Sequence, residues 1–525
     1  MILKSYKTFL LALAVLIVSA CETFDMDLQD NPDALTLESA DVDLLFNSIQ
    51  FSFRNQMNGL GFLTDQSMRL VNQFGTYTPG QAAMNGTWGN VYTTGTNITG
   101  LEVFAERDGF TFHLGAAQVM QATMYLNIVD FIGTAVFSEA NNPIDFPNPG
   151  LDDGASIYAG LTALLDEGIA NLQGGGRAPL QDFFFAGDAD NWVKYANTVK
   201  LRMAVQTRLI DAGGATSTIN SLVAGGNLID ETSEDLVFRY GTNGPPVESR
   251  HPLFTGNYIN GAGGYQSNGL ISYMKDSSAA PDPRLRYYFY RQTDRDLVNT
   301  NPDLVPCLNS PQYDFCYVGD LYFGRDHADN EGIPGDQNLR TTYGAYPAGG
   351  AYDNDQFVAA TASGASGAGA YAPLHLSAWT HFMLAEAALT LGTTGTATTY
   401  LETGIRNHMA NVAAFNPGGM TATQVDDYVA EVLTDYAAAD AAGQLDIIIR
   451  EWYLASFTTG LLPYNNFRRT GYPSMLQQPV INAGAFVRSY FLPESELNSN
   501  TNEDFSEQKA ITDAVFWDNN GDIIY

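Results

Sequence analysis

The chain has 525 residues, of which 45% are hydrophobic, and its formal net charge is −33 at pH 7. This apolar fraction favours a folded protein with a substantial core over a disordered chain. The excess of carboxylates argues against nucleic acid and anionic lipid headgroups as partners, because a strongly negative surface repels phosphates.

The first 20 residues have the pattern of a secretory signal. Lys4 and Lys7 precede an uncharged apolar run over residues 9–20, which ends in small residues before Cys21. A helix that spans a bilayer needs ~20 apolar residues, so this run is too short to cross a membrane. We predict that residues 1–20 form a signal peptide that is removed on export.

Cys21 directly follows the small residues Ser19 and Ala20, as in the lipobox of bacterial lipoproteins. We predict that its thiol is acylated and that residues 21–36 form a tether between the lipid and the folded domain. Three acyl chains, at ~0.8 kcal/mol per buried CH₂, would hold the protein at the membrane through this anchor alone. Loss of the two signal lysines changes the formal charge from −33 to −35. The alternative is an ordinary signal peptide with an incidental cysteine.

Helical periodicity dominates both halves of the chain. In residues 42–57 an apolar side chain recurs every four residues from Leu45 to Met57, after an Asp- and Ser-rich start that can cap a helix. Further helices are predicted at residues 88–104, 114–129, 157–172, 192–210, 374–389, 398–412, 425–433 and 445–457. Successive helices of this length favour a mainly α fold in which antiparallel helical pairs stack into a scaffold.

The middle of the chain, residues 230–370, has a different composition. It is rich in Gly, Asn, Asp, Pro and Tyr, and its low-complexity segment 359–370 is expected to be a mobile loop. Long loops on a rigid scaffold commonly carry binding residues. We therefore predict a single domain over residues 37–525. Its helical scaffold would cover about 37–229 and 371–525, with a loop-rich ligand-binding lobe between them.

Cys307 and Cys316 are the cysteines that remain once Cys21 is assigned to lipid. They flank a turn-rich segment, and an exported protein meets an oxidising environment, so we favour a disulfide between them. By loop-closure entropy this small ring would contribute about 2–3 kcal/mol, which would fix a loop rather than hold up the fold. No histidine or second cysteine pair lies at ligand spacing nearby, which argues against a metal site there.

Several short motifs occur in an order that resembles the SusD/RagB family of nutrient-binding outer-membrane lipoproteins. The most specific is the helix at residues 192–209, WVKYANTVKLRMAVQTRL, which resembles the family's W-x-K-ANSLKLR helix. The other matching segments are Asp30-Asn31-Pro32, residues 128–140, Asp282-Pro283-Arg284-Leu285, Glu386-Ala387, Glu451-Trp452, residues 466–473 and residues 493–500. Ala135-Val136 and Thr198 depart from the family pattern, and we interpret these departures as packing variation.

This resemblance implies a scaffold of four tetratricopeptide-type helical pairs and an irregular lobe that carries the ligand loops. It also implies a lipid-anchored position at the outer membrane, facing the cell exterior, where the protein would act as a lid on a SusC-like TonB-dependent transporter. The family implies binding without catalysis. We therefore expect no enzymatic activity, and a glycan or another oligomeric nutrient as the ligand.

Sugar rings are recognised by flat aromatic side chains together with amides or carboxylates that bridge two hydroxyl groups. In the loop region after the first helix, where the family places one side of its site, the candidates are Gln73, Tyr77 and Asn85. In the lobe the candidates are Asn257, Tyr258, Tyr265, Tyr317 and Tyr322, and Tyr346 and Tyr352 share the same setting. Each tyrosine taken singly is more often a packing residue, but together we expect two or three to line the site.

The tryptophans are better explained by packing than by ligand binding. Trp88, Trp192, Trp379 and Trp452 fall on predicted amphipathic helices, so they are interpreted as core residues. For Trp517, near the acidic C-terminus, the sequence indicates neither packing nor ligand binding.

The arginine clusters have two interpretations. Arg468 and Arg469 are interpreted as structural residues that pair with acids. Arg284, Arg286 and Arg291 are close enough in sequence to form a basic patch. Such a patch would reverse the mild exclusion of polyanionic ligands that the net charge implies.

Metal and catalytic motifs are weak. The acidic loops at residues 152–153, 188–190 and 326–336 could hold Ca²⁺ through carboxylates and carbonyls, but none has EF-hand spacing, so we expect neither a metal nor a cofactor. No HExxH, GxSxG or phosphate-binding Gly-Lys-Ser/Thr motif is present, and His375 and His381 would lie on different helix faces. Chance pairs among the 58 acidic residues leave glycoside hydrolysis as an alternative.

The sequence thus predicts a surface lipoprotein that captures an oligomeric nutrient, with a glycan as the leading hypothesis, and delivers it to a TonB-dependent transporter. A peptide ligand is the second hypothesis, because the RagB side of the family is consistent with it. The third hypothesis is a helical-repeat scaffold that organises proteins at the envelope without a small ligand.

Overall fold

The computed structural model describes residues 41–261, 264–293, 313–315, 321–331 and 340–521. The signal peptide, Cys21 and the 21–36 tether lie outside these residues, as do Cys307, Cys316 and Tyr317. The lipidation, the disulfide and the ligand role of Tyr317 therefore stay predictions.

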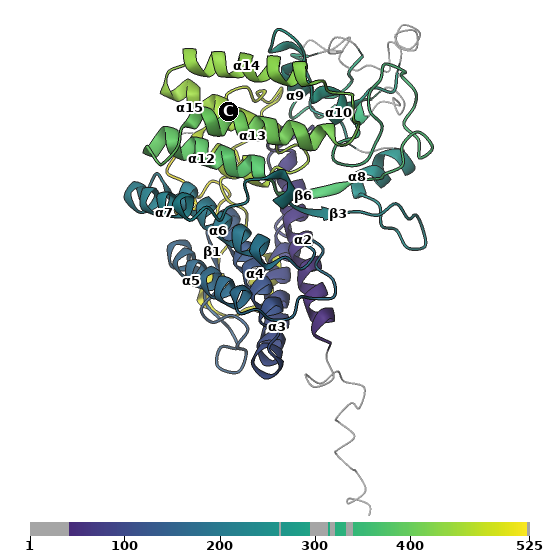
Figure 1. Cartoon of the computed structure of the whole chain (residues 1–525). Helices are drawn as coiled ribbons and strands as arrows, with labels where there is room; N and C mark the ends of the chain where they lie inside the picture. Colours follow the sequence, from purple (N-terminus) through teal and green to yellow (C-terminus); the bar gives the residue numbers. More distant parts are fainter. Residues whose placement is uncertain (1–40, 262–263, 294–312, 316–320, 332–339, 522–525) are drawn as a thin grey trace, which may run out of the picture.

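The N-terminal half consists of long helices that pack against their neighbours in sequence (Figure 1). The Asp41 carboxylate accepts hydrogen bonds from the Asp43 and Leu44 N–H groups, so the predicted cap of the first helix is present. Asp153 and Asp188 cap later helices in the same way. The helices are α2 (Val42–Asp65), α3 (Asn85–Asp108), α4 (Thr111–Ile132), α5 (Gly154–Gln173), α6 (Ala189–Thr207) and α7 (Ala212–Gly225).

The stack of helices continues after the lobe (Figure 1). α12 contacts α6 and α7, and α16 packs on α2, which joins the end of the chain to its beginning. The helices are α12 (Ser377–Leu391), α13 (Ala397–Ala413), α14 (Ala422–Ala438), α15 (Ala441–Leu454), α16 (Leu461–Thr470) and α17 (Glu494–Ser499). The predicted mainly α fold, with helical pairs and an irregular lobe, is confirmed. None of the helices in the described residues is both long and apolar enough to span a membrane.

Every predicted helical segment contains a helix, but α7, α16 and the short α17 of the scaffold fall outside the predicted set, as do α8, α9 and α10 of the lobe. α7 buries only Ala215 and Ile219, so its periodicity is weak. α16 is rich in polar residues although nearly all of them are buried, which hides it from any argument based on apolar spacing. Leu374 and His375, predicted to begin a helix, instead end a strand, because a short buried apolar run does not distinguish the two structures.

Short antiparallel strand pairs organise the lobe. β3 (Leu236–Arg239) pairs with β6 (Tyr371–His375), so the two ends of the lobe leave the scaffold side by side (Figure 1). The elements between them are α8 (Pro252–Phe254), the π-helical turn η4 (Thr255–Ile259), α9 (Asn268–Asp276), α10 (Leu285–Tyr288), and the paired strands β4 (Phe289–Tyr290) and β5 (Thr342–Tyr343). Elsewhere lie the strand pair β1 (Thr134–Ala135) and β2 (Asp152–Asp153) and the 3₁₀ turns η3 (Thr232–Glu234) and η7 (Glu503–Phe505).

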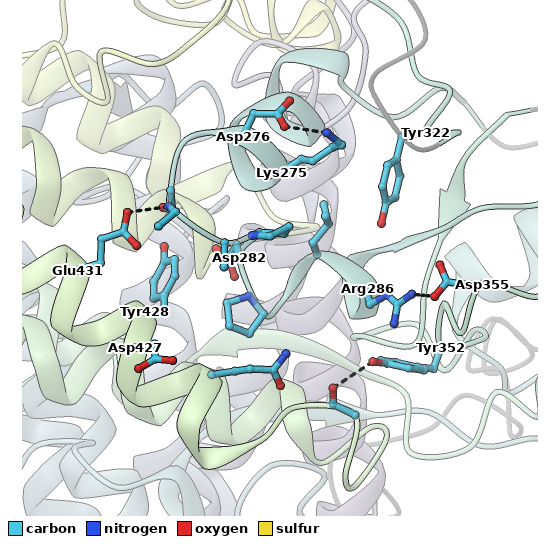
Figure 2. Close-up of a pocket in the computed structure, with 18 of the residues that line it drawn as sticks. Lys275, Asp276, Asp282, Arg286, Tyr322, Tyr352, Asp355, Asp427, Tyr428 and Glu431 are labelled. Carbon is cyan, nitrogen blue, oxygen red and sulfur yellow. Dashed lines mark hydrogen bonds and ion pairs between the residues drawn. The ribbon is translucent and has the colours of Figure 1, made fainter.

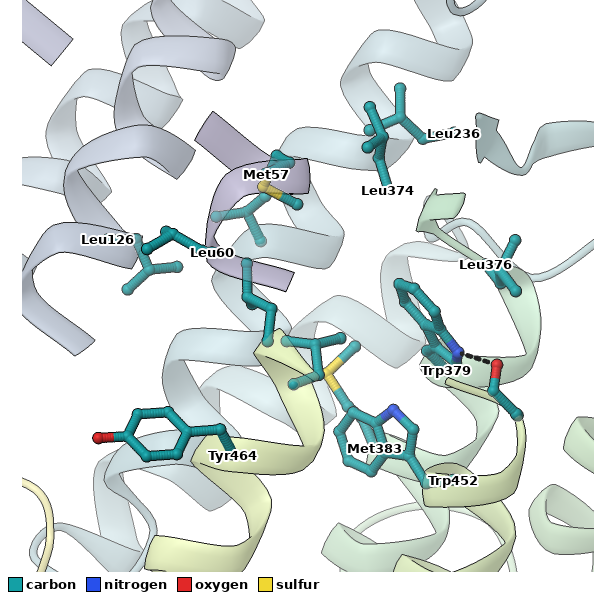
Figure 3. Packing of buried hydrophobic residues seen from close by; sticks show 14 of the residues in the cluster. Met57, Leu60, Leu126, Leu236, Leu374, Leu376, Trp379, Met383, Trp452 and Tyr464 are labelled. Carbon is teal, nitrogen blue, oxygen red and sulfur yellow. Dashed lines mark hydrogen bonds between the residues drawn. The ribbon is translucent and has the colours of Figure 1, made fainter. Parts of the chain in front are cut away.

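One hydrophobic core joins the two halves of the scaffold. Figure 3 shows Met57 of α2 and Leu126 of α4 in the same cluster as Met383 of α12 and Trp452 of α15. All four side chains are buried. Because residues more than 300 positions apart in this numbering share the core, the scaffold is one packed unit that can hold the lobe in a fixed place.

All five tryptophans are core residues, each at most 2% exposed. This confirms the interpretation of Trp88, Trp192, Trp379 and Trp452. Trp517 is fully buried as well, and it closes the core from near the C-terminus.

A buried polar network around Asp130 ties distant helices together. Asp130 lies on α4 and is fully buried. Its Oδ1 accepts hydrogen bonds from the Tyr158 hydroxyl (2.5 Å) and the Trp517 indole (3.0 Å). Its Oδ2 accepts hydrogen bonds from the Arg202 guanidinium (2.6 Å) and the Asn465 amide (2.9 Å). One carboxylate therefore links α4 to α5, α6, α16 and the C-terminal segment.

The predicted pairing of Arg469 with an acid is confirmed, and that of Arg468 needs a correction. Arg469 pairs with the fully buried Glu386 at 2.7 Å, and Arg208 binds the same carboxylate at 2.7 Å. Arg468 instead donates a hydrogen bond to the backbone carbonyl of Asp130 at 2.6 Å. That carbonyl lies in the last turn of α4, where the helix provides no N–H donor for it and a cation is favourable.

We expect the free energy of unfolding to depend on pH through Asp65, which lies at the end of α2. Burial raises the pKa of Asp65 to about 8, and the Gly460 N–H offsets this only in part. An unfolded aspartate ionises near pH 3.9, so between about pH 4 and pH 8 folding retains a proton that the unfolded chain releases. The stability contributed by neutral Asp65 is therefore complete at low pH and is lost as the pH rises through this window.

Asp65→Asn should remove this pH dependence of stability, because the amide has no proton to release. We expect the stability of the wild type to fall more steeply with pH than that of the variant, by up to ~1.4 kcal/mol per pH unit. Urea unfolding of both proteins at several pH values between 4 and 8 measures the two slopes. Equal slopes would contradict the neutral, buried state of Asp65.

Candidate ligand-binding site

The loop after α2 contains the first group of predicted ligand residues. Tyr77 is 3% exposed, and its hydroxyl contacts the Arg69 guanidinium at 3.0 Å and the His327 imidazole. Gln73 is also buried, and its amide donates a hydrogen bond to a carbonyl of the same loop at 2.8 Å. These side chains hold the loop in place. The aromatic ring that the loop exposes is that of Phe74, which is 60% accessible.

Three further predicted residues serve packing. Tyr265 is buried beside the guanidinium groups of Arg325 and Arg340, whose centres lie 4.7 and 5.0 Å from its ring centre. Asn257 is buried and donates a hydrogen bond to a carbonyl one turn earlier, at 2.7 Å. Asn85, half-buried at the start of α3, accepts a hydrogen bond from a backbone N–H of α17 at 3.4 Å. None of the three lines either of the two cavities described next.

A cleft of about 880 Å³ lies between the lobe and α14, and we call it the α14 cleft (Figure 2). One side is a face of α14 that carries Gln424, Asp427 and Glu431. The other side is made by the chain from Lys275 to Arg286, by Tyr322 and by the Tyr352 loop. The volume is that of an ordinary small-ligand site, for which ~300–1,000 Å³ is typical. Of the residues predicted from sequence, Tyr322 lines this cleft.

The α14 side of the cleft is acidic. Asp427 and Glu431 are four residues apart on one helix, so they project from the same face. Glu431 accepts a hydrogen bond from the Ala279 N–H at 3.0 Å. Asp427 is exposed and has no ion-pair partner among the described residues. Both carboxylates therefore have lone pairs available to a ligand.

The opposite side of the cleft carries cations that are already paired. Lys275 pairs with Asp276 at 2.7 Å, and Arg286 pairs with Asp355 (Figure 2). Asp427 and Glu431 thus face neutralised cations, and the unpaired charge among the described residues of the cleft is negative.

The possible basic patch of three arginines does not form. Arg284 is fully buried between Asp282 (2.6 Å) and Glu451 (3.1 Å), and its pKa is held well above the usual range by these acids although burial opposes this. Arg291 is buried against Asp353 at 2.7 Å. Arg284 and Arg291 are thus neutralised, and Arg286 is paired with Asp355, so these three arginines do not form an unpaired cationic surface.

A second cavity of about 470 Å³ adjoins the first, and we call it the neutral cavity. The aromatic residues that line it are Tyr258, Tyr290, Tyr352 and Phe415, and the amides are Asn354, Gln356 and Asn416. No charged side chain is among the described residues that line it. Burial raises the pKa of Tyr258 and of Tyr290, so both hydroxyl groups stay protonated.

The predicted residue Tyr258 is held at the wall of the neutral cavity. Its hydroxyl donates a hydrogen bond to the Tyr343 carbonyl at 2.7 Å and accepts one from the Ala351 N–H at 2.9 Å. Its ring stacks on Phe254 with 5.1 Å between ring centres. Tyr258 therefore shapes the cavity with a ring that other contacts keep in place.

The described structure offers no metal centre. No three His, Cys, Asp or Glu side chains gather in the described residues in a way that could hold an ion. Asp153 and Asp188 cap α5 and α6, and Asp152 accepts hydrogen bonds from the Phe137 and Ser138 N–H groups at 2.9 and 2.8 Å. The first two acidic loops considered for Ca²⁺, at residues 152–153 and 188–190, thus use these carboxylates to accept hydrogen bonds from the protein's own N–H groups. Residues 332–336 of the third loop lie outside the described residues.

Sequence reasoning missed most of the residues that line the two cavities. Tyr352 shares the Gly- and Asn-rich setting of the predicted tyrosines, which is a signal, although it is not among the eight selected residues. Asp427 and Glu431 carry no such signal, because acids on an amphipathic helix are usually just its solvated face. Their role depends on which loops pack beside α14.

Comparisons with known proteins agree with this fold. The sequence profile of a family described as SusD-like, starch-binding and associating with the outer membrane, matches residues 33–302 and 326–491. No protein of curated function matches the sequence.

Solved structures resemble the chain over nearly its whole length. A SusD homolog from Bacteroides uniformis is 17% identical, with a TM-score of 0.67, and the match covers 91% of this chain and 100% of that one. A chitin-binding SusD homolog from Flavobacterium johnsoniae is 18% identical, with a TM-score of 0.64 and coverages of 92% and 100%. A SusD/RagB family protein from Bacteroides thetaiotaomicron is 19% identical, with a TM-score of 0.67 and coverages of 92% and 99%. At these identities the likeness concerns the fold alone.

Proposed function

This chain belongs to the SusD-like family, and we propose that it is a surface lipoprotein that captures a glycan and delivers it to a SusC-like TonB-dependent outer-membrane transporter. The signal peptide and the lipobox cysteine predicted from sequence support an anchored position outside the cytoplasm. The family's description as starch-binding and associating with the outer membrane supports the ligand class and the location.

The observation that carries the proposal is the composition of the α14 cleft. Tyr352 provides a half-buried ring, while Tyr322 is only 3% exposed and forms part of the wall. Asp427, Glu431 and Gln424 provide planar groups that can each bridge two hydroxyls. Such a mixture suits the hydroxyl rim and apolar face of a sugar. The cleft is large enough for a small oligosaccharide.

We assign the protein to binding rather than catalysis. The family is described as starch-binding, and one similar structure is described as a chitin-binding homolog. Both descriptions name neutral polysaccharides, and the excess of unpaired acid over unpaired base in the α14 cleft is consistent with a ligand that carries no negative charge.

Affinity electrophoresis of residues 22–525 through gels that contain starch, chitin derivatives, laminarin and other polysaccharides tests this function. Retardation by a neutral glycan supports it. Calorimetry with peptides tests the second hypothesis, in which the acids of α14 would receive the amino groups of a peptide. Absence of binding in both experiments would favour the third hypothesis, an envelope scaffold without a small ligand.

Two single variants separate the two candidate surfaces for the glycan. If the α14 cleft binds it, Asp427→Ala should weaken the affinity about tenfold, ~1.4 kcal/mol, because an exposed carboxylate that can bridge two hydroxyls is lost. Phe74→Ala, on the exposed loop after α2, should leave the affinity within about twofold. Asp435→Ala, at an exposed acid of the same helix outside the cleft, is the matched control. The reverse pattern would move the site to the Phe74 loop.

A further inference from the structure

The two cavities are separated by a thin wall built from two loops. Along the first loop, Asp355 lines the α14 cleft, whereas Asn354 and Gln356 line the neutral cavity. In the second loop, Gly419 lines the cleft and Asn416 lines the neutral cavity. Tyr352 lines both cavities. The two cavities are therefore adjacent at Tyr352.

Hydrogen bonds hold the wall in one conformation. The Tyr352 hydroxyl donates to the Gly419 carbonyl at 3.0 Å, which joins the two loops directly (Figure 2). Beneath them, Tyr287 donates to the Asn416 carbonyl at 2.9 Å, and its ring meets that of Tyr352 edge-on with 4.8 Å between centres. Tyr352 is half-buried, so part of this fixed ring remains accessible.

Ion pairs fix the base of the first loop. Asp353 is buried against Arg291 at 2.7 Å, and Asp355 pairs with both Arg286 and Arg291. Asp355 adopts a φ of 63°, a left-handed backbone conformation that is uncommon outside glycine. Residues in such conformations persist where their surroundings hold them, and they are often found at binding sites.

We propose that the α14 cleft and the neutral cavity form one binding groove for an extended, uncharged glycan chain that crosses Tyr352, with a sugar ring lying on its side chain. This proposal rests on the glycan-binding function proposed above. Each cavity has the volume of a separate small-ligand site, about 880 and 470 Å³. A mono- or disaccharide would occupy one of them, whereas a longer chain can occupy both.

The chemistry of the two cavities selects against a polyanionic chain. The described lining of the neutral cavity has aromatic rings, amides and hydroxyls but no charge to pair with a uronate or sulfate, so burying one there would cost free energy. In the cleft, the free carboxylates Asp427 and Glu431 would repel the same groups. A chain of neutral sugars meets neither penalty.

Occupying both cavities with one chain makes the second contact intramolecular. Linked sites gain affinity over either site alone by about 10²-fold or more when the linker spans them. We expect the affinity to rise by at least about tenfold once an oligosaccharide is long enough to cross Tyr352, and to level off beyond that length.

Calorimetry with maltooligosaccharides and with N-acetylchitooligosaccharides, each from the disaccharide upward, tests the groove. In the wild type the affinity should show this step with length. Tyr352→Ala should abolish the step. Asn354→Ala, at an exposed position, should also reduce it because an amide that lines the neutral cavity is lost, while binding of the shortest oligosaccharide stays within about twofold. Asn519→Ala, at an exposed asparagine outside both cavities, is the matched control.

Affinity that does not change with length, or a step that survives both Tyr352→Ala and Asn354→Ala, would overturn the continuous groove while leaving glycan capture intact. No binding of any length in either series, or in the polysaccharide gels, would overturn glycan capture and the groove together. Retention of a polyuronate such as alginate as tightly as a neutral glycan would overturn the selection against charge.

Discussion

Replacing Asp130 by asparagine should lower the free energy of unfolding by about 3–5 kcal/mol. The carboxylate is fully buried, and four donors surround its two oxygens. In the variant the side chain has one oxygen and one NH₂ group. Whichever way the amide is turned, the NH₂ group faces a pair of donors and leaves them without an acceptor.

One of those donors is the nearly buried guanidinium of Arg202, which Asp130 neutralises at 2.6 Å. A buried charge that loses its partner carries a larger penalty than a neutral donor does. The loss also reaches beyond α4, because Trp517 and Asn465 depend on the same carboxylate for their hydrogen bonds. We therefore expect one cooperative loss of stability across the scaffold rather than local fraying.

Urea unfolding of residues 22–525, followed by tryptophan fluorescence, measures this change. Asp166→Asn is the matched control, because Asp166 also pairs with a cation, Lys200, but is 67% exposed. Removing that surface pair should cost no more than ~1 kcal/mol. Equal effects of the two variants would show that the Asp130 network does not carry the predicted share of the stability.

Replacing Cys21 by serine should release the protein from the membrane almost completely. In the predicted lipoprotein the acyl chains depend on Cys21, and the strongly acidic chain that follows is repelled by an anionic surface. At ~0.8 kcal/mol per buried CH₂, the loss of the acyl chains removes essentially all of the anchoring free energy.

Fractionation of cells that produce the full chain, followed by a carbonate wash of the membranes, measures the release. Ser19→Ala keeps the cysteine and a small residue before it, so this variant should remain in the membrane fraction. If Cys21→Ser stays in the washed membranes, the predicted lipid anchor is wrong.

Purification of the wild type from detergent extracts also tests the proposed transporter partner, because a SusC-like partner should copurify as a large β-barrel protein.

Local pattern was enough to predict the helices of the scaffold. The apolar repeat of α2 and the aspartate that caps it are both short-range features, so the predicted start of the helix agrees with the structure. The segments that escaped prediction lack such features. α16 is buried through side chains such as Arg468 and Arg469, and only their distant partners explain why polar residues lie in the core.

Far fewer residues of the candidate site than of the scaffold could be predicted from the sequence. Gln73, Tyr77, Asn257 and Tyr265 have the right chemistry for sugar binding, yet the fold uses their polar groups and rings to fix loops. Tyr322 and Tyr258 line cavities, but so do several residues that have no distinguishing pattern. Residue type alone does not tell an anchoring tyrosine from a ligand-binding one.

The sequence by itself determined the helical scaffold, the core role of four tryptophans and, through ordered motifs, the family, and it predicts the export signal. These depend on residues close in the chain or on motif order. Only the tertiary structure decided that Trp517 closes the core, that Arg284 and Arg291 are neutralised, and that Asp427 faces Tyr322 and Tyr352 across one cleft. The physical reason is that burial, ion pairing and cavity shape arise from contacts between segments far apart in the chain, which no local spacing encodes.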